Sequence, residues 1–146
     1  MKNDTFKASA ATWDSDRGRL NTAKTVAQAI KNILPFKSVD YAMDYGCGTG
    51  LISLELLPVI KNLTGIDLSD AMLDIFRKKI KENNLKNVEL VKINSELDEL
   101  PYHPYDLIFS SMTIHHVEHH IELLEKFYNI LDNKKKIQIV FGSRFT

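Results

Sequence analysis

Cysteine is almost absent from this 146-residue sequence, which has only Cys47. One cysteine cannot form an internal disulfide or supply a cysteine-based zinc site, and its rarity is typical of a reducing compartment. The chain also lacks a run approaching the roughly 18 apolar residues of a membrane-spanning helix, and residues 1–7 lack the apolar segment of a signal peptide. These absences predict a cytoplasmic protein that is neither exported nor held in a membrane.

No charge of one sign dominates, because lysine plus arginine and aspartate plus glutamate both number 19. A domain that binds nucleic acid normally carries a basic excess, so the composition does not favour that partner. Nucleic-acid binding would require a local basic patch. Internal repeats, low-complexity runs and linker-like stretches are absent as well. With 44% hydrophobic and 26% charged residues, the sequence predicts a single globular domain over 1–146.

Strand-like and helix-like patterns alternate along the chain. An amphipathic pattern over 23–34 predicts a helix within an N-terminal helical lead-in, 1–38, ahead of an α/β core, 39–146. Helical patterns in the core follow Gly50, follow Ser69 and cover 121–131. Strands are expected at 39–45, 63–67, 88–93, 105–110 and 136–141. Such alternation predicts right-handed βαβ units, hence a doubly wound, mainly parallel sheet with helices on both faces.

Three glycines, Gly46, Gly48 and Gly50, follow the first predicted strand. Ligands of such sheets bind at the carboxyl ends of the strands, and glycine lets the backbone turn sharply and approach a ligand closely. A dinucleotide fingerprint would need glycine where Leu51 stands, and the Gly-Lys-Ser/Thr of a P-loop is missing. Asp67 ends the second strand about 20 residues after the turn, a spacing at which an acidic side chain accepts hydrogen bonds from ribose hydroxyls. The pair of features predicts a ribose-containing ligand without requiring a pyrophosphate.

The segment 44–50 resembles D-x-G-x-G-x-G, the first motif of class I S-adenosylmethionine-dependent methyltransferases. Segments 65–73 and 105–117 resemble the family's second and fourth-strand motifs, 131–133 its turn before the fifth strand, and 11–14 the lead-in of many small-molecule members. The resemblance covers nearly the whole chain. It implies a Rossmann-like methyltransferase fold, with S-adenosylmethionine as cofactor and S-adenosylhomocysteine as product.

The resemblance also implies which residues bind the cofactor. Gly46, Cys47 and Gly48 would approach its amino acid part, and Asp67 would hold both ribose hydroxyls unless it only introduces the following helix. A carboxylate buried beside the glycines, Asp44, needs partners, which the cofactor ammonium or the loop amides would supply. For Cys47 we expect a small residue in a tight loop rather than a nucleophile. The full set is Asp44, Gly46, Cys47, Gly48, Gly50, Asp67, Leu68, Met72, Asn94, Ser95 and Ser110.

The adenine end of this site is implied by residues after the second and third strands. Leu68 and Met72 would flank the adenine ring. Asn94 and Ser95 stand where the family often places an aspartate that bonds the adenine amino group. Asn94 departs from that pattern, because an amide stands where the family often has a carboxylate.

A histidine-rich run over 115–120 has two interpretations. His115 with His119, and His116 with His120, have the i, i+4 spacing of one helix face, but the zincin pattern H-E-x-x-H is absent, so we expect no metal. The resemblance places His115 and His116 beside the transferring methyl group, where either would orient an acceptor or take its proton.

Other conspicuous side chains have plain structural interpretations. Trp13 and Tyr102 are expected to pack rather than close over the cofactor. The lysines are expected to lie on solvated faces, at 78, 79, 81 and 134–136.

The sequence predicts a methyltransferase that acts on a small molecule. Methyl transfer from a sulfonium is a one-step displacement, so the protein mainly aligns the reacting atoms and needs no covalent residue. Family members usually continue after the fifth strand with a helix and two antiparallel strands, whereas this sequence ends at Thr146. The alternatives are a non-catalytic cofactor-binding or structural fragment, and an RNA or protein methyltransferase. An exposed fifth strand predicts a homo-oligomer, which a monomeric mass in solution would reject.

Overall fold

The computed structural model describes residues 9–35, 37–111, 113–131 and 137–141, with only the backbone described for 137–141 and His115. Within these residues, five parallel strands form one sheet in the order β3-β2-β1-β4-β5. The strands are β1 (Val39–Tyr45), β2 (Ile60–Asp67), β3 (Val88–Lys92), β4 (Leu107–Ser111) and β5 (Ile137–Phe141). The predicted α/β fold with a parallel sheet is therefore confirmed.

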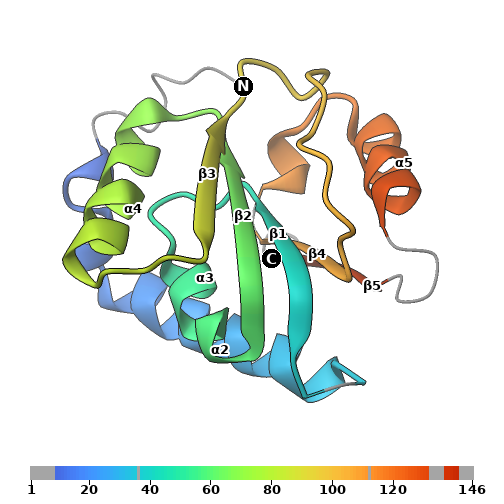
Figure 1. Cartoon of the computed structure of the whole chain (residues 1–146). Coiled ribbons are helices and arrows are strands. Elements are labelled where there is room, and N and C mark those ends of the chain that lie inside the picture. The colour runs from blue at the N-terminus through green and yellow to red at the C-terminus, as the bar shows by residue number, and fades with distance from the viewer. Residues whose placement is uncertain (1–8, 36, 112, 132–136, 142–146) are drawn as a thin grey trace.

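Helices cover both faces of the sheet. In Figure 1, α2, α3 and α4 lie to one side of it and α5 to the other. The helices are α2 (Arg17–Ile33), α3 (Leu51–Leu56), α4 (Asp70–Glu82) and α5 (His120–Ile130), with 3-10 turns η1 (Trp13–Ser15), η2 (Leu57–Val59) and η3 (Ile114–His116). The strand order reverses between β1 and β4, where sheets of this kind form a crevice at the carboxyl ends of their strands.

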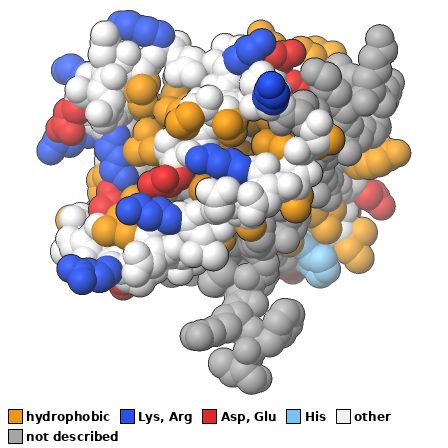
Figure 2. Space-filling view, turned by 90° about the horizontal axis from the view of Figure 1, so that it is seen from below, with side chains coloured by type: hydrophobic (Ala, Val, Ile, Leu, Met, Phe, Trp, Pro, Cys, Tyr) orange, Lys and Arg blue, Asp and Glu red, His pale blue; other side chains and the backbone are white. Residues whose placement is uncertain are grey.

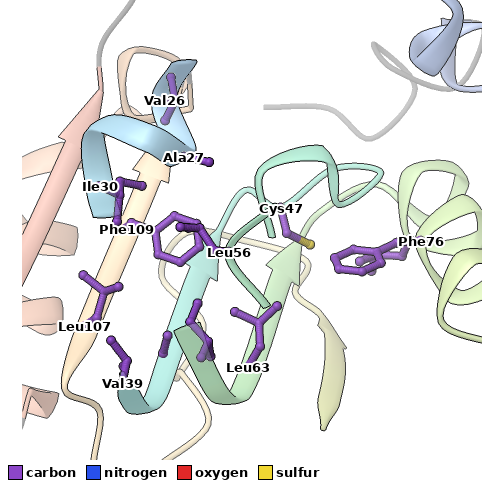
Figure 3. Close-up of a cluster of buried hydrophobic side chains, with 13 residues drawn as sticks. Val26, Ala27, Ile30, Val39, Cys47, Leu56, Leu63, Phe76, Leu107 and Phe109 are labelled. Atoms are coloured by element: carbon purple, nitrogen blue, oxygen red, sulfur yellow. The ribbon is translucent and has the colours of Figure 1, made fainter. Parts of the chain in front are cut away.

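Two apolar clusters, one on each face, hold the layers together. Figure 3 shows the first, in which side chains of α2, α3 and α4 meet those of β1, β2 and β4. In β4, Leu107 and Phe109 join this cluster, while Ile108 between them joins the second cluster with Phe127 of α5. All four side chains are almost fully buried. Each contributes about 1.5–3 kcal/mol by leaving water, so the central strands are the rigid frame of the crevice.

Two elements begin earlier than the sequence pattern predicts. Helix α2 begins at Arg17 rather than residue 23, because the Asp16 carboxylate caps it by accepting the Arg19 N–H at 3.2 Å. Strand β2 begins at Ile60 rather than residue 63. Its ladder with β1 already includes Asn62, whose side chain is exposed, so the apolar pattern starts later than the pairing.

The remaining boundaries differ by one or two residues. Strand β4 starts at Leu107, and Tyr105 forms only an isolated bridge to Leu131. The predicted start of β5 at Lys136 lies outside the described residues. Among those described, β5 pairs only with β4 and forms an edge of the sheet, and the predicted assembly through this edge stays a prediction. In the same residues, no helix has both the length and the apolar character to cross a bilayer.

Candidate functional site

A cavity of about 530 Å³ opens at the carboxyl ends of β1, β2 and β4. One wall comes from the lead-in: Trp13, Asp16, Gly18, Arg19, Thr22 and Ala23. The second wall comes from the glycine turn, the strand ends and the starts of the elements that follow them: Asp44, Gly46, Cys47, Gly48, Thr49, Leu51, Ile52, Asp67, Leu68, Met72, Ser111, Thr113 and His116. The cavity thus lies at the crevice where the strand order reverses, which is where a ligand is expected.

The glycine turn is bound to the end of β2 by its own backbone. The N–H groups of Gly46 and Cys47 both donate to the Ile66 carbonyl, at 2.7 and 2.9 Å. Gly46, Gly48 and Gly50 have φ values of +78°, +57° and +86°, in the left-handed region that favours glycine. A Cβ on Gly46 would collide with the Thr113 side chain, whereas a Cβ on Gly48 would meet no atom within 4 Å. The turn therefore leaves open space at Gly48, beside the cavity.

Asp67 lies at the carboxyl end of β2, where both of its oxygens accept backbone hydrogen bonds. Gly48 N–H donates to Oδ2 at 2.8 Å and Ser69 N–H donates to Oδ1 at 2.9 Å. Burial raises the pKa of this carboxyl, and hydrogen bonds from the backbone of Ser69, Gly48 and Leu68 oppose the rise. Asp67 also lines the cavity, and a carboxylate oxygen can accept more than one hydrogen bond, so this carboxylate has acceptor capacity for ligand hydroxyls.

Asp44 ends up almost fully buried near the end of β1, where it lines the cavity. Burial raises the pKa of its carboxyl to about 7, the hydrogen bond that Ser53 Oγ donates to Oδ2 at 2.6 Å opposes the rise, and nearby Asp67 adds to it. A cation bound beside this carboxyl would favour its ionised form. Burial likewise raises the pKa of the Cys47 thiol, which is the state of an unreactive cysteine.

Replacing Asp44 by asparagine is expected to flatten the pH dependence of stability. Its pKa is about 7 in the folded protein against 3.8 in a model peptide, so between these values the folded state holds a proton that the unfolded chain has lost. The free energy of unfolding of the native protein therefore falls as pH rises from about 4 to 7, by an amount of order 3 kcal/mol. In Asp44→Asn this contribution disappears. Urea unfolding at pH 4.5 and 7.5 measures it.

The matched control for this measurement is Asp74→Asn, at an exposed carboxylate of α4 that pairs with Arg77 at 2.8 Å. This variant is expected to keep the pH slope of the native protein. An Asp44→Asn protein whose stability varies with pH as steeply as that of the native protein would contradict the account of Asp44.

The other predicted cofactor residues are divided between the cavity and its surroundings. Leu68 and Met72 line the cavity, while Gly50 and Ser110 do not. Gly50 is the N-cap of α3, and Ser110 is fully buried, with its Oγ donating to the Tyr45 carbonyl at 2.8 Å. Ser110 therefore joins β4 to β1, and the next residue of the strand, Ser111, lines the cavity.

Asn94 and Ser95 line a second cavity of about 220 Å³ that shares Leu68, Thr113 and His116 with the first. The backbone N–H groups of Asn94 and Ser95 donate to Asp98 Oδ2, at 2.8 and 3.3 Å. These bonds fix the loop after β3 at the edge of the main cavity. The predicted adenine contact of Asn94 stays a prediction.

The histidine run does not form one helix. His116 lies in η3 and lines both cavities, whereas α5 begins only at His120. In the described part of the chain, one grouping brings potential metal ligands within 4.8 Å of one another, namely Glu96, Glu118 and His119. The Glu96 carboxylate there accepts the backbone N–H groups of Glu118 and His119, at 3.2 and 3.1 Å. Its contacts are those of a cap before α5, and the expectation of no metal stays a prediction.

The lead-in wall is the part of the site that the sequence interpretation missed. Trp13 was expected to pack, but it lines the cavity with the Arg19 guanidinium 3.7 Å from its ring centroid. Tyr102 is 80% exposed, so its predicted packing is wrong. The prediction of a solvated Lys79 is also wrong, because its ammonium pairs with Asp14 and donates to the Thr49 carbonyl at 2.9 Å. Asp16, a strong N-cap type, was the available signal that a helix begins beside these residues.

Comparison with known proteins places this architecture in a family. The methyltransferase domain family matches residues 42–134. An uncharacterized methyltransferase of Schizosaccharomyces pombe is 32% identical over 96 residues, which cover 61% of this chain and 34% of that protein. The demethylmenaquinone methyltransferase of Lactobacillus johnsonii is 29% identical over 118 residues, which cover 77% of this chain and 48% of that protein. The chain spans half or less of the length of these two relatives.

A solved structure agrees in fold. Phosphoethanolamine N-methyltransferase 2 of Haemonchus contortus, in complex with S-adenosyl-L-methionine, has a TM-score of 0.70 at 22% sequence identity, over 79% of this chain and 27% of that one. At this identity the likeness establishes the fold alone. With a family match over more than half of its residues and with this fold, the chain belongs to the methyltransferase domain family.

Proposed function

We propose that this chain binds S-adenosylmethionine in the main cavity and serves in methyl transfer to a small molecule. The observation that carries the proposal is the Asp67 carboxylate, which faces the cavity from the end of β2 while holding Gly48 of the glycine turn at 2.8 Å. An acidic residue at this place in the fold is suited to ribose hydroxyls. The match to the methyltransferase domain family supports the same conclusion.

The chemistry of the buried side chains fits this cofactor. Asp44 presents a carboxyl with a pKa of about 7 to the cavity, and a ligand ammonium group would complete its partners. Gly46 to Gly48 would approach the amino acid part of the cofactor. Leu68 and Met72 are apolar lining residues suited to the faces of an adenine ring. Asn94 and Ser95 lie in the adjoining cavity, within reach of the same end of the site.

The chain's own residues would align the reaction rather than take a covalent part in it. The bound cofactor supplies an activated methyl group on sulfur, so the protein has to hold the acceptor atom in line with that group. Thr113 and His116, just after β4, line the cavity at the crevice. We assign to His116 the orientation of the acceptor, or removal of its proton where the acceptor is protonated. His115 is the neighbouring candidate from the sequence, and its side chain lies outside the described residues.

Replacing His116 by alanine is expected to lower kcat by about 100-fold with the acceptor that the chain uses, because a positioned acid–base group typically contributes at least this factor. Affinity for S-adenosylmethionine should fall much less than kcat, because His116 is one of many residues that line the cavity and the proposed hydrogen bonds to the cofactor come from Asp44, the glycine turn and Asp67. Steady-state kinetics with calorimetric binding separates the two effects. His103→Ala is the matched control, because His103 stacks on Tyr41 and pairs with Glu89 away from the cavity. An unchanged kcat in His116→Ala would remove His116 from the reaction.

A small-molecule acceptor is favoured over RNA or a protein by two observations. The Lactobacillus johnsonii relative is a demethylmenaquinone methyltransferase, whose name indicates a small quinone-derived acceptor. On the face shown in Figure 2, Lys and Arg side chains are spread among apolar, acidic and other polar side chains instead of forming one basic stripe. Nucleic-acid binding depends on such a concentration of positive charge.

The experiment that tests the proposal measures S-adenosylhomocysteine formed from S-adenosylmethionine in the presence of different acceptors. The panel contains reduced naphthoquinones, phenols and primary amines in one arm, and total RNA and denatured protein in the other. Turnover with a member of the first arm supports the proposal. Cofactor binding without turnover in either arm would instead support the non-catalytic alternative, and turnover with RNA or protein would replace the acceptor class.

A further inference from the structure

Three segments that are distant in sequence meet at the carboxylate of Asp14. Asp14 belongs to η1 of the lead-in, Thr49 to the glycine turn and Lys79 to α4. Thr49 Oγ1 donates to Asp14 Oδ1 at 2.6 Å, and the Lys79 ammonium pairs with Asp14 Oδ2. Lys79 also donates to the Thr49 carbonyl at 2.9 Å, which closes a triangle of polar contacts.

The triangle is sheltered from water. Thr49 is 1% exposed, and the side chains of Lys79 and Asp14 are 19% and 31% exposed. By contrast, the ion pair of the neighbouring Lys78 with Glu82 is 3.9 Å long, with side chains 76% and 60% exposed. Exposed pairs contribute little because water and salt screen them, whereas a short, sheltered, charge-assisted contact is stronger.

Polar contacts carry unusual weight at this point because η1 has no buried residue of its own. Apolar burial therefore holds Trp13–Ser15 less firmly than it holds the strands of the sheet, where whole side chains are buried. In Figure 1 the N-terminal blue segment lies alongside α4, where Lys79 reaches it. The contact with Lys79 and Thr49 fixes the start of the lead-in against the turn.

The residue next to Asp14 belongs to the cavity. Trp13 lines it, and the Arg19 guanidinium, which also lines it, lies against the Trp13 ring. Thr49, in the glycine turn, lines the same cavity. Asp14 therefore connects the two walls between which the proposed ligand would lie.

We propose that Asp14 and Lys79 form a latch that holds the Trp13–Arg19 wall against the glycine turn and so slows the escape of bound S-adenosylmethionine. The inference rests on the proposed function for the ligand. Both residues are positioning residues, since their effect passes through Trp13 and the turn. By linkage, a ligand that touches both walls strengthens the latch as much as the latch strengthens binding.

The test uses the chain's single tryptophan, Trp13, as the reporter of the wall. The variants are Lys79→Met, Asp14→Asn and their combination, with Lys78→Met as the matched control on the same helix. In ligand-free protein, acrylamide quenching of Trp13 fluorescence reports whether the wall opens. Stopped-flow displacement of bound S-adenosylmethionine by excess S-adenosylhomocysteine gives the dissociation rate constant.

The latch predicts that Lys79→Met increases Trp13 quenching in the ligand-free protein and raises the dissociation rate constant about tenfold, the scale of one charge-assisted contact. Asp14→Asn should act in the same direction. The combination should exceed neither single variant by more than about twofold, because both remove the same interaction. Lys78→Met should match the native protein in both readouts.

Each negative result has a distinct meaning. If the native protein binds S-adenosylmethionine but Lys79→Met changes neither Trp13 quenching nor the dissociation rate constant, the latch is overturned and the proposed function stays intact. If the native protein does not bind S-adenosylmethionine, the proposed function is wrong. Trp13 quenching in the ligand-free variants then still decides whether Lys79 holds the Trp13–Arg19 wall. Additive effects of the two substitutions would show two independent sites and also overturn the latch.

Discussion

Replacing Asp67 by alanine is expected to weaken S-adenosylmethionine binding by about 100-fold or more, since hydrogen bonds to a charged group contribute roughly 1.5–3 kcal/mol each. The carboxylate has two tasks in this account. It holds the Gly48 N–H at 2.8 Å and the Ser69 N–H at 2.9 Å, and its remaining lone pairs would accept from the ribose hydroxyls. Calorimetric titration of native and variant protein measures the loss.

Two control variants separate binding from stability. Ser69→Ala removes the side chain that caps α4 by accepting the Met72 N–H at 3.2 Å, so it destabilises the protein by about 1 kcal/mol and leaves the Asp67 carboxylate in place. Asp70→Ala removes a mostly exposed carboxylate, three residues after Asp67, that pairs with Lys92. Both variants should bind within about threefold of the native protein. A Ser69→Ala protein as weak as Asp67→Ala would show that the loss comes from the fold.

Replacing Gly50 by alanine is expected to destabilise the protein by about 2–4 kcal/mol, the range of an overpacked core combined with left-handed strain. Its φ is +86°, and an added Cβ would lie 2.7 Å from the ring of Phe76, which is fully buried against the sheet. The ring cannot withdraw without disturbing the first apolar cluster. Urea unfolding monitored by far-UV circular dichroism measures the change.

Gly48→Ala is the comparison within the same turn. Gly48 has a φ of +57°, but its added Cβ would meet no atom within 4 Å. We expect a loss of only about 1 kcal/mol, from backbone strain alone. Because that side of Gly48 faces open space at the cavity, this variant should lose more ligand affinity than stability. Equal destabilisation by the two substitutions would contradict the packing described at Phe76.

The sheet and the two acidic residues were predictable because their signals are local. The first strand, the glycine turn and Asp67 are each read from a few neighbouring residues, and parallel pairing then brings Asp44 and Asp67 to one edge. The structure confirms the parallel sheet and places both carboxyls on one cavity. Neighbouring residues of a strand point to opposite sides, so an error of one residue changes which side chain is assigned to the site. Ser110 was predicted to bind the cofactor, but Ser111 lines the cavity and Ser110 bonds to β1.

The lead-in wall was not predictable in the same way because its contacts join residues far apart in sequence. Lys79 belongs to a run of basic residues on α4 that reads as a solvated face, and only the fold brings it to Asp14. Trp13 belongs to segment 11–14, which resembles the family's lead-in, but an isolated aromatic residue is as typical of packing as of a ligand site, and only the fold brings it to the cavity. The start of α2 was missed because Gly18, Asn21 and Thr22 interrupt the apolar pattern there, although the Asp16 cap compensates.

The central claim is that the cavity at the glycine turn selects S-adenosylmethionine, and calorimetric titration of the native chain with S-adenosylmethionine and, in parallel, with NAD tests it most directly. The account predicts saturable binding of S-adenosylmethionine at one site per chain and no comparable binding of NAD, because Leu51 replaces the third glycine of the dinucleotide fingerprint. Binding of NAD in preference to S-adenosylmethionine, or binding of neither, would contradict it.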